Sequence, residues 1–238
     1  TAFRAKTLDA ARPCAVCFED CTRVRMSDFM VHNSPNWTIH PVRCENVTID
    51  NLTIVNPFDS PNTDGIDPES CRNVRITGCH IDVGDDCIAV KAGTEDALED
   101  VPCENIAITG CTMVHGHGGV VLGSEMSGGI RRVSITGCVF DGTDRGIRIK
   151  SRRGRGGAVE DVSVTGIVMN DVLCPLVINL MYFCGKDGKL PIVSDPNAQP
   201  VTDATPHVRR IRMADIVVTN AKSAAACLYG LPEAPLED

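Results

Sequence analysis

Aromatic residues are scarce in this sequence of 238 residues, where phenylalanine, tryptophan and tyrosine together make up only 4%. Valine, isoleucine and threonine recur instead in short runs, with 21 glycines along the chain and without the 3.6-residue period of an amphipathic helix. β-branched residues favour strands. The scarcity of aromatics and the missing helical period argue against packed helices, and the composition predicts many short strands.

Long hydrophobic runs are also absent. No stretch of about 18 apolar residues occurs, which argues against a membrane-spanning helix. The opening residues TAFRAKTLDA lack the apolar core of a secretory signal, and the missing initial methionine is compatible with a processed or trimmed chain. We therefore predict no membrane partner, and the cellular location stays open.

Positive charge is in deficit. The 23 lysines and arginines face 31 aspartates and glutamates, so the formal net charge of −8 repels polyanions such as nucleic acids. Basic residues nevertheless gather in one stretch without acidic residues: Arg145, Arg148, Lys150, Arg152, Arg153 and Arg155. This stretch also lacks the interleaved aromatics of single-strand binding sites. We predict no nucleic-acid partner and interpret its last three arginines as a solvated loop or as further contacts for an anionic ligand.

A repeated pattern organises the chain. Seven similar segments place an apolar residue in register at Val24, Val47, Val74, Ile106, Val133, Val162 and Ile211. A second apolar strand follows in six of these units, at Ile39, Ile66, Ile88, Val120, Ile147 and Leu176. Self-similarity at this period indicates a solenoid, and strands this short without helical periodicity indicate a parallel β-helix, in which equivalent positions stack about 4.8 Å apart.

The 13 cysteines follow the same repeat. Four of them lie three residues before the registered position (Cys21, Cys44, Cys71 and Cys103), and three lie five residues after it (Cys79, Cys111 and Cys138). Small thiols suit stacked interior rows, whereas disulfides cannot use an odd number of cysteines. The pair in CAVC (14–17) has no second such pair to complete a metal site. We predict free, buried thiols, which are compatible with a reducing compartment.

Six residues that can carry chemistry fall within three positions of the second strand in consecutive units: Asp64, Asp85, Asp86, His117, Arg148 and Lys150. Stacking brings them to one corner of the solenoid. Carboxylates that are held together either bind a cation or shift their pKa values for proton transfer. We therefore expect three carboxylates, one histidine and two cations to line a single groove.

These residues belong to four ordered motifs, NTD (62–64), DD within GDDC (84–87), GHG (116–118) and RIK (148–150). On these motifs the sequence resembles glycoside hydrolase family 28, the polygalacturonases. The resemblance implies an all-β, right-handed parallel β-helix that hydrolyses α-1,4-galacturonosyl linkages of pectin or oligogalacturonates with inversion and needs no metal or cofactor. GSEMSGG and TDRGIRIKSRRGRGG look like the bacterial exo-acting branch.

The resemblance also implies catalytic roles. Asp85 would be the general acid that protonates the leaving oxygen, and Asp64 and Asp86 would activate the water. Two ionised neighbours are expected to raise the pKa of Asp85 and keep it protonated. His117 would tune the acid. Gly84 stands where many family members carry glutamine, which leaves the leaving-group side of the site less defined.

Substrate binding is expected from residues beside the carboxylates. Arg148 supplies a planar fork for the uronate carboxylate, and Lys150 supplies a point charge. Asn62 and Tyr182 are expected to make further substrate contacts. Inverting glycosidases usually separate their carboxyls by about 6.5–9.5 Å, whereas adjacent coils stack more closely, so the stereochemistry follows from the resemblance alone.

Alternative interpretations stay open at this point. Clustered carboxylates bind calcium in pectate lyases of the same architecture, and a β-helix can also serve as a non-catalytic carbohydrate-binding or structural protein. Rhamnogalacturonan is the nearest competing substrate. We expect residues 1–238 to form one β-helix domain that is a fragment lacking terminal coils, with an inserted loop at 181–206.

Overall fold

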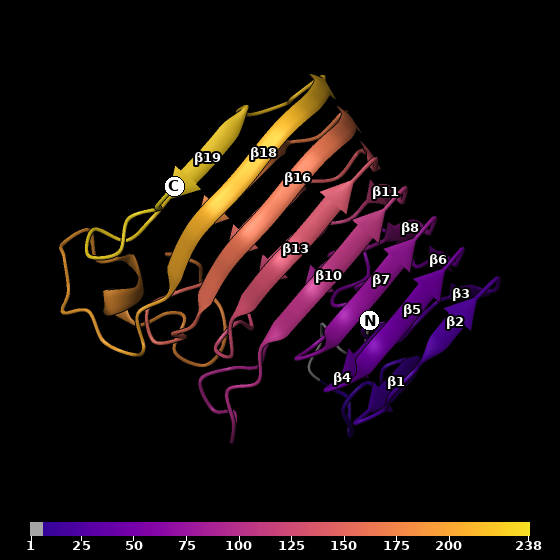
Figure 1. Cartoon of the computed structure of the whole chain (residues 1–238), viewed down its shortest axis with the longest axis horizontal. Coiled ribbons are helices and arrows are strands. Elements are labelled where there is room, and N and C mark those ends of the chain that lie inside the picture. Colours follow the sequence, from indigo (N-terminus) through magenta and orange to yellow (C-terminus); the bar gives the residue numbers. More distant parts are fainter. Residues whose placement is uncertain (1–6) are drawn as a thin grey trace.

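The computed structural model describes residues 7–238 as three rows of strands (Figure 1). The first row contains β2 (Arg25–Ser27), β5 (Glu45–Asp50), β7 (Arg72–Thr77), β10 (Cys103–Thr109), β13 (Ile130–Thr136), β16 (Ala158–Asn170) and β18 (His207–Thr219). The second contains β3 (Met30–His32), β6 (Thr53–Val55), β8 (His80–Val83), β11 (Thr112–His115) and β14 (Val139–Asp141), which pairs with the second half of the long strand β16. The third contains β1 (Val16–Glu19), β4 (Ile39–Val42), β9 (Ile88–Val90), β12 (Val120–Gly123), β15 (Arg145–Lys150), β17 (Cys174–Asn179) and β19 (Ala226–Tyr229).

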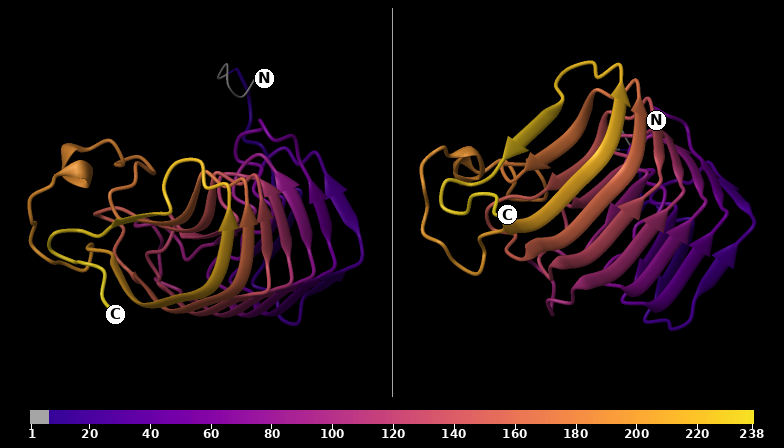
Figure 2. Two further views of the ribbon diagram at one scale, coloured as in Figure 1. Left: turned by 90° about the horizontal axis from the view of Figure 1, so that it is seen from above. Right: turned by 45° about the horizontal axis from the view of Figure 1, so that its top comes forward.

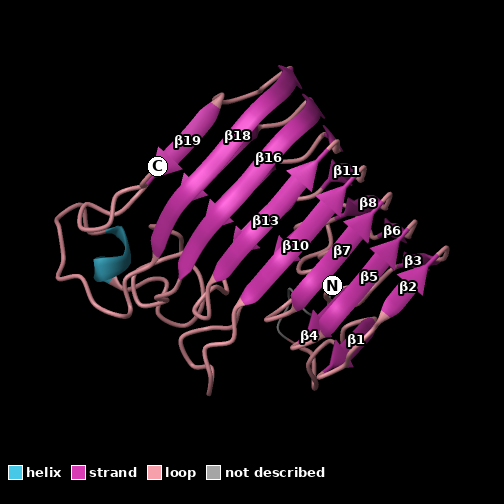
Figure 3. Cartoon of the chain, in the orientation of Figure 1, coloured by secondary structure: helices cyan, strands magenta, loops and turns pink. Residues whose placement is uncertain are grey.

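Successive turns of the chain stack on one another. A turn such as β7, β8 and β9 adds one strand to each row, and neighbouring strands within a row pair in parallel. Figure 2 shows the turns side by side along the solenoid. In Figure 3 the described chain is strand and loop apart from the short 3-10 helix η1 (Pro191–Ser194). The prediction of a right-handed parallel β-helix is confirmed.

The predicted register is confirmed in both rows that the sequence defines. In the first row, Val47, Val74, Ile106, Val133, Val162 and Ile211 pair in this order. In the third row, Ile39, Ile66, Ile88, Val120, Ile147 and Leu176 pair likewise, with Ile66 joined through isolated bridges. Residues counted from these positions therefore lie above one another on adjacent turns.

Left-handed backbone recurs at fixed places in each turn. The residue directly before the registered valine or isoleucine has a positive φ, as in Asn46 (59°), Asn73 (58°) and Asn105 (59°). Asparagine tolerates this conformation, and its amide also bonds to the next turn, since Asn105 Nδ2 donates to Asn73 Oδ1 at 3.0 Å. Gly78 (61°) and Gly110 (63°) occupy the bend between the first and second rows. The glycines thus mark the bends between the first two rows, whereas the asparagines lie within the first-row strands and link neighbouring coils.

The interior is a continuous row of aliphatic side chains and thiols. All 13 cysteines are free. Six of the seven cysteines in the two predicted ladders are buried, which confirms their interior position, and Cys21 is only partly buried. The thiols also find acceptors, since Cys71 Sγ lies 3.3 Å from the Pro41 carbonyl oxygen of the preceding turn. A buried thiol thus fills the narrow interior without leaving a polar group unpaired.

Arg152, Arg153 and Arg155, which follow β15, are buried, so their interpretation as a solvated loop is wrong. Arg152 pairs with Glu95, and Arg155 Nε lies 3.2 Å from the same carboxylate. Arg153 Nε donates to Glu233 at 2.6 Å. Arg152 also donates to the Cys184 carbonyl oxygen at 2.9 Å. Because a buried guanidinium needs acceptors for its donors, these residues anchor the long connections 92–102 and 180–206 to the solenoid.

No helix in the part of the chain that the structure describes is long and apolar enough to span a membrane.

Candidate active site

Two consecutive turns bring the predicted carboxylates together just before the third row of strands, and the next turn adds His117. The Gly65 amide donates to the Asp86 carbonyl oxygen at 3.0 Å, which stacks Asp64 on Asp86. The His117 amide donates to the Asp85 carbonyl oxygen at 3.1 Å, which stacks the histidine on the adjacent aspartate. One oxygen from each of the three carboxylates lies within 4.8 Å of the others. The structure therefore gathers the residues that the motifs predict.

Asp86 forms the most buried ion pair of this group. Its side chain is only 1% exposed, and Lys150 Nζ donates to its Oδ2 at 2.6 Å. Arg148 lies on β15, the strand that also carries Lys150, and its guanidinium is 3.9 Å from Asp86 Oδ1. The coulombic attraction of Asp86 raises the pKa of Lys150 against the opposing effect of burial. Asp86 and Lys150 therefore form a buried ion pair.

Asp85 lies nearer the surface, with 18% of its side chain exposed. It accepts a hydrogen bond from the Asn62 amide at 3.0 Å, and His117 Nδ1 lies 3.4 Å from its Oδ1. Burial alone would raise the pKa of Asp85, but His117 and the Asn62 amide stabilise the anion and hold the pKa below its usual value. The contact with Asp85 in turn raises the pKa of His117.

Asp64 carries the raised pKa that the sequence analysis assigned to Asp85. Burial raises the pKa of Asp64 to about 7, and the charges of Asp86 and Asp85 add to this effect while Lys91 opposes it. The expectation of a raised pKa at Asp85 is wrong for the chain without ligand. Asp85 lies at the rim, where a histidine and an amide stabilise its charge, whereas Asp64 is buried and its Oδ1 has no hydrogen-bond partner among the described residues.

The two further residues predicted to contact substrate lie on either side of the carboxylates. The ring of Tyr182 is stacked beside the cations, with its centroid 5.0 Å from Arg148 Cζ and 5.4 Å from Lys150 Nζ. Asn62 contributes its backbone amide to Asp85, while its side-chain oxygen accepts a hydrogen bond from Arg12 at 2.7 Å. Tyr182 therefore lies beside a cationic surface, and Asn62 positions a carboxylate.

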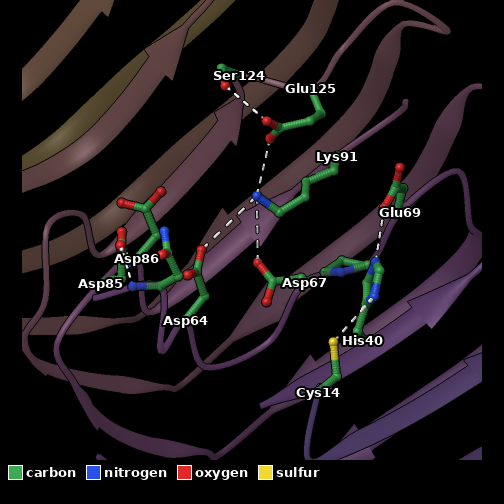
Figure 4. A network of polar contacts seen from close by, with 12 residues as sticks. Cys14, His40, Asp64, Asp67, Glu69, Asp85, Asp86, Lys91, Ser124 and Glu125 are labelled. Carbon is green, nitrogen blue, oxygen red and sulfur yellow. Dashed lines mark hydrogen bonds and ion pairs between the residues drawn. The ribbon is translucent and has the colours of Figure 1, made fainter. Parts of the chain in front are cut away.

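The sequence analysis missed three charged residues behind the site, which Figure 4 shows. Lys91 Nζ lies 3.2 Å from Glu125 Oε2, 3.7 Å from Asp67 Oδ1 and 4.0 Å from Asp64 Oδ2. The repeat could have indicated Lys91, because this lysine follows Ile88 by three residues, as Lys150 follows Ile147. The two lysines thus occupy the same row of the solenoid, two turns apart.

The three carboxylates resemble a cation site in number, but their surroundings favour proton chemistry. Lys150 already donates to Asp86, and Lys91 lies 4.0 Å from Asp64. Two ammonium groups beside the same oxygens would repel a divalent cation. Asp64, Asp85 and Asp86 are therefore better suited to hold and move protons than to coordinate calcium.

Gly84, which precedes Asp85, packs closely against the turn at residues 57–60. A Cβ at position 84 would lie 2.4 Å from the Ser60 carbonyl oxygen and 2.5 Å from the Pro57 carbonyl oxygen. We expect Gly84→Ala to lower the free energy of unfolding by about 1–3 kcal/mol and to lower kcat, because the displaced turn carries the Asn62 amide away from Asp85. Urea unfolding and steady-state kinetics measure the two effects.

Gly78→Asn is the matched control for this substitution. Its φ is 61°, nothing lies within 4 Å of a Cβ there, and Asn51 occupies the equivalent position of the preceding turn with a φ of 52°. We expect stability and kcat close to those of the wild type. Equal effects of the two substitutions would show that the turn at Ser60 does not position Asp85.

Comparison with known proteins yields one family. The model of glycosyl hydrolases family 28 matches residues 3–227. A probable polygalacturonase of Vitis vinifera is 37% identical over 236 residues, which cover 98% of this chain and 46% of the relative. An endo-polygalacturonase of Pectobacterium carotovorum subsp. carotovorum is 34% identical over 173 residues, which cover 73% of this chain and 42% of the relative. The chain thus spans less than half the length of these two relatives.

Solved structures show the same likeness. An exopolygalacturonase from Thermotoga maritima superposes with a TM-score of 0.81 at 33% identity, covering 94% of this chain and 48% of that one. A polygalacturonase from Erwinia carotovora ssp. carotovora superposes with a TM-score of 0.74 at 24% identity, covering 99% of this chain and 62% of that one. At this identity the likeness concerns the fold alone.

Proposed function

Because the chain belongs to glycosyl hydrolases family 28, we propose that its protein hydrolyses α-1,4-galacturonosyl linkages of pectin or oligogalacturonates. This proposal depends on one observation. Three carboxylates, each with one oxygen within 4.8 Å of the others, lie beside the cations Arg148 and Lys150. Carboxylates can transfer the protons of glycoside hydrolysis, and the cations suit a sugar that bears a carboxylate.

Proton donation is assigned to Asp85 together with His117. The two groups lie 3.4 Å apart at the exposed side of the site, so a proton on His117 can pass through Asp85 to the leaving oxygen. As the glycosidic bond breaks, that oxygen takes the proton and the anomeric carbon accepts the attacking water. This role survives the low pKa of Asp85 in the free chain, because the raised pKa of His117 keeps a proton in the pair.

Water activation is assigned to Asp64 and Asp86, which lie deeper than Asp85. Lys150 Nζ donates to Asp86 Oδ2 at 2.6 Å and fixes this carboxylate, so Asp86 can orient the water while Asp64 takes its proton. We propose inversion at the anomeric carbon. The carboxylates lie closer together than is usual for inverting enzymes, so this part of the proposal depends on the family and not on the spacing.

Action at the chain end is the second part of the proposal. It is supported by the likeness to the exopolygalacturonase from Thermotoga maritima, which superposes with a TM-score of 0.81. It is also supported by the two long connections 92–102 and 180–206, which Arg152 joins by binding Glu95 and the Cys184 carbonyl oxygen, and the second of which carries Tyr182 beside Arg148. Such connections can restrict how far a polymer extends past the carboxylates.

The test uses polygalacturonate and the full-length protein. We expect release of reducing sugar, no rise in ultraviolet absorbance, and steady formation of one short product from the start. An increase in absorbance would indicate an unsaturated product and a lyase, and binding without turnover would indicate a carbohydrate-binding protein. A broad range of early products would contradict exo action. Proton NMR of the first anomer released decides between inversion and retention.

A further inference from the structure

A buried carboxyl group lies directly behind the water-activating aspartate. Asp67 is completely buried, three residues after Asp64, and the two carboxyls are close enough for a hydrogen bond if one of them is protonated. Neither oxygen of Asp67, nor Oδ1 of Asp64, has a hydrogen-bond partner among the described residues. Figure 4 shows both carboxyls facing the ammonium group of Lys91. Buried polar atoms rarely remain unpaired, so a proton between the two carboxyls accounts for their arrangement.

The charges around Lys91 require such a proton. This lysine is 4% exposed and faces three carboxyls within 4.0 Å, those of Asp64, Asp67 and Glu125. Glu125 is already held as an anion, because Lys91 and Arg155 outweigh the effect of burial and lower its pKa to about 2. One ammonium group cannot also neutralise two further buried anions. One negative charge and one proton on the pair formed by Asp64 and Asp67 would avoid burying a second uncompensated anion beside Lys91.

Within the proposed hydrolase function, we propose that Asp67 and Lys91 are positioning residues: protonated Asp67 donates a hydrogen bond to Asp64, and Lys91 keeps Asp64 anionic and oriented toward the water. The proton resides on Asp67 because this side chain is fully buried, whereas Asp64 opens toward the other catalytic carboxylates. Burial and the charge of Asp64 raise the pKa of Asp67 well above its usual value. Asp64 then remains free to accept a proton from water.

The remaining groups that face this pair do not supply a competing cation at the same distance. The other charged or titratable groups that interact electrostatically with Asp64 or Asp67 are Asp85, Asp86, Lys150, Cys14 and Cys87. Lys150 is engaged with Asp86 at 2.6 Å. The indole of Trp37 covers Lys91, with the ring centroid 4.4 Å from Nζ. Lys91 is therefore the cation that determines the charge of Asp64.

The first test measures kcat and KM against pH for Lys91→Met. Since Lys91 lowers the pKa of Asp64, its loss raises that pKa and moves the acid limb of kcat/KM to higher pH, by about one pH unit or more. At pH values well above the acid limb, KM should stay within about twofold of the wild type, because Lys91 is buried behind the carboxylates. Arg153→Met is the matched control, since it breaks another buried pair, with Glu233, away from Asp64. Its acid limb should not move.

The second test compares two variants of Asp67. Asp67→Leu removes the donor to Asp64 and should lower kcat about tenfold, whereas Asp67→Asn keeps a donor and should restore most of this loss. The infrared difference spectrum of wild type and Asp67→Asn at neutral pH should contain the carbonyl stretch of a protonated carboxyl. This band does not depend on activity, so it tests the inference even if the protein acts on another substrate.

The inference is wrong if folded Lys91→Met keeps the acid limb of the wild type, or if the infrared band is missing. If Lys91→Met does not fold, the band and the comparison of Asp67→Leu with Asp67→Asn decide. Absence of turnover by the wild type, with the band present, would instead contradict the hydrolase function and leave the shared proton established.

Discussion

Asp85→Asn is expected to lower kcat on polygalacturonate by about 10²–10⁴-fold, the usual contribution of a general acid. Asparagine has nearly the same shape and still accepts the hydrogen bond from the Asn62 amide, but it cannot transfer a proton to the leaving oxygen. The effect should fall on kcat, with KM changed little. Initial rates of reducing-sugar release, measured at saturating substrate, give the ratio to the wild type.

Asp82→Asn provides the matched control for this prediction. Asp82 lies three residues earlier, and its carboxylate is paired with His115 at 2.8 Å in an exposed position. Both aspartates therefore face a histidine of the next turn, but Asp82 lies away from the carboxylate cluster. Its amide variant should retain the activity of the wild type. Loss of activity in both variants, or in neither, would remove Asp85 from the role of general acid.

Lys150→Met is expected to lower both activity and stability. It leaves the Asp86 carboxylate buried without its closest cation, which typically costs about 3–5 kcal/mol of unfolding free energy. Activity should fall to the limit of detection, because the same substitution removes a cation that faces the substrate carboxylate in our proposal. Urea unfolding gives the first quantity, and initial rates on polygalacturonate give the second.

The double variant Asp86→Asn, Lys150→Met separates the two effects. Because asparagine at position 86 carries no charge, the double variant should recover much of the stability that Lys150→Met loses. Activity should stay absent, because Asp86 no longer orients the water. A cycle of the two single variants and the double variant measures the coupling energy of the pair. Additive losses of stability would mean that the contact at 2.6 Å does not contribute to folding.

The repeat explains how much of the fold and of the site could be predicted. Val47, Val74 and Ile106 share a register because each turn must place an apolar side chain inside and must pair with the turn before it. That condition is local and periodic, so it is visible in the chain. Counting from the second strand also brought Asp64 and Asp86 to one corner, as the structure confirms.

Burial and charge could not be predicted in the same way. The basic run after β15 gave no sign that Arg152, Arg153 and Arg155 are covered by segments distant in sequence, such as the one that carries Cys184. The raised pKa was likewise assigned to Asp85, because the order of the motifs does not report which carboxyl loses its contact with water.

The sequence by itself therefore determined the solenoid, its register, its interior thiols and the residues that meet at the site, because these follow from a repeating pattern of side chains along the chain. Only the tertiary structure decided that Asp64 has the raised pKa and that Lys91 and Asp67 lie behind it. The energy of a charge depends on solvent and on neighbours from other turns, and neither is set by the residues adjacent to it in sequence.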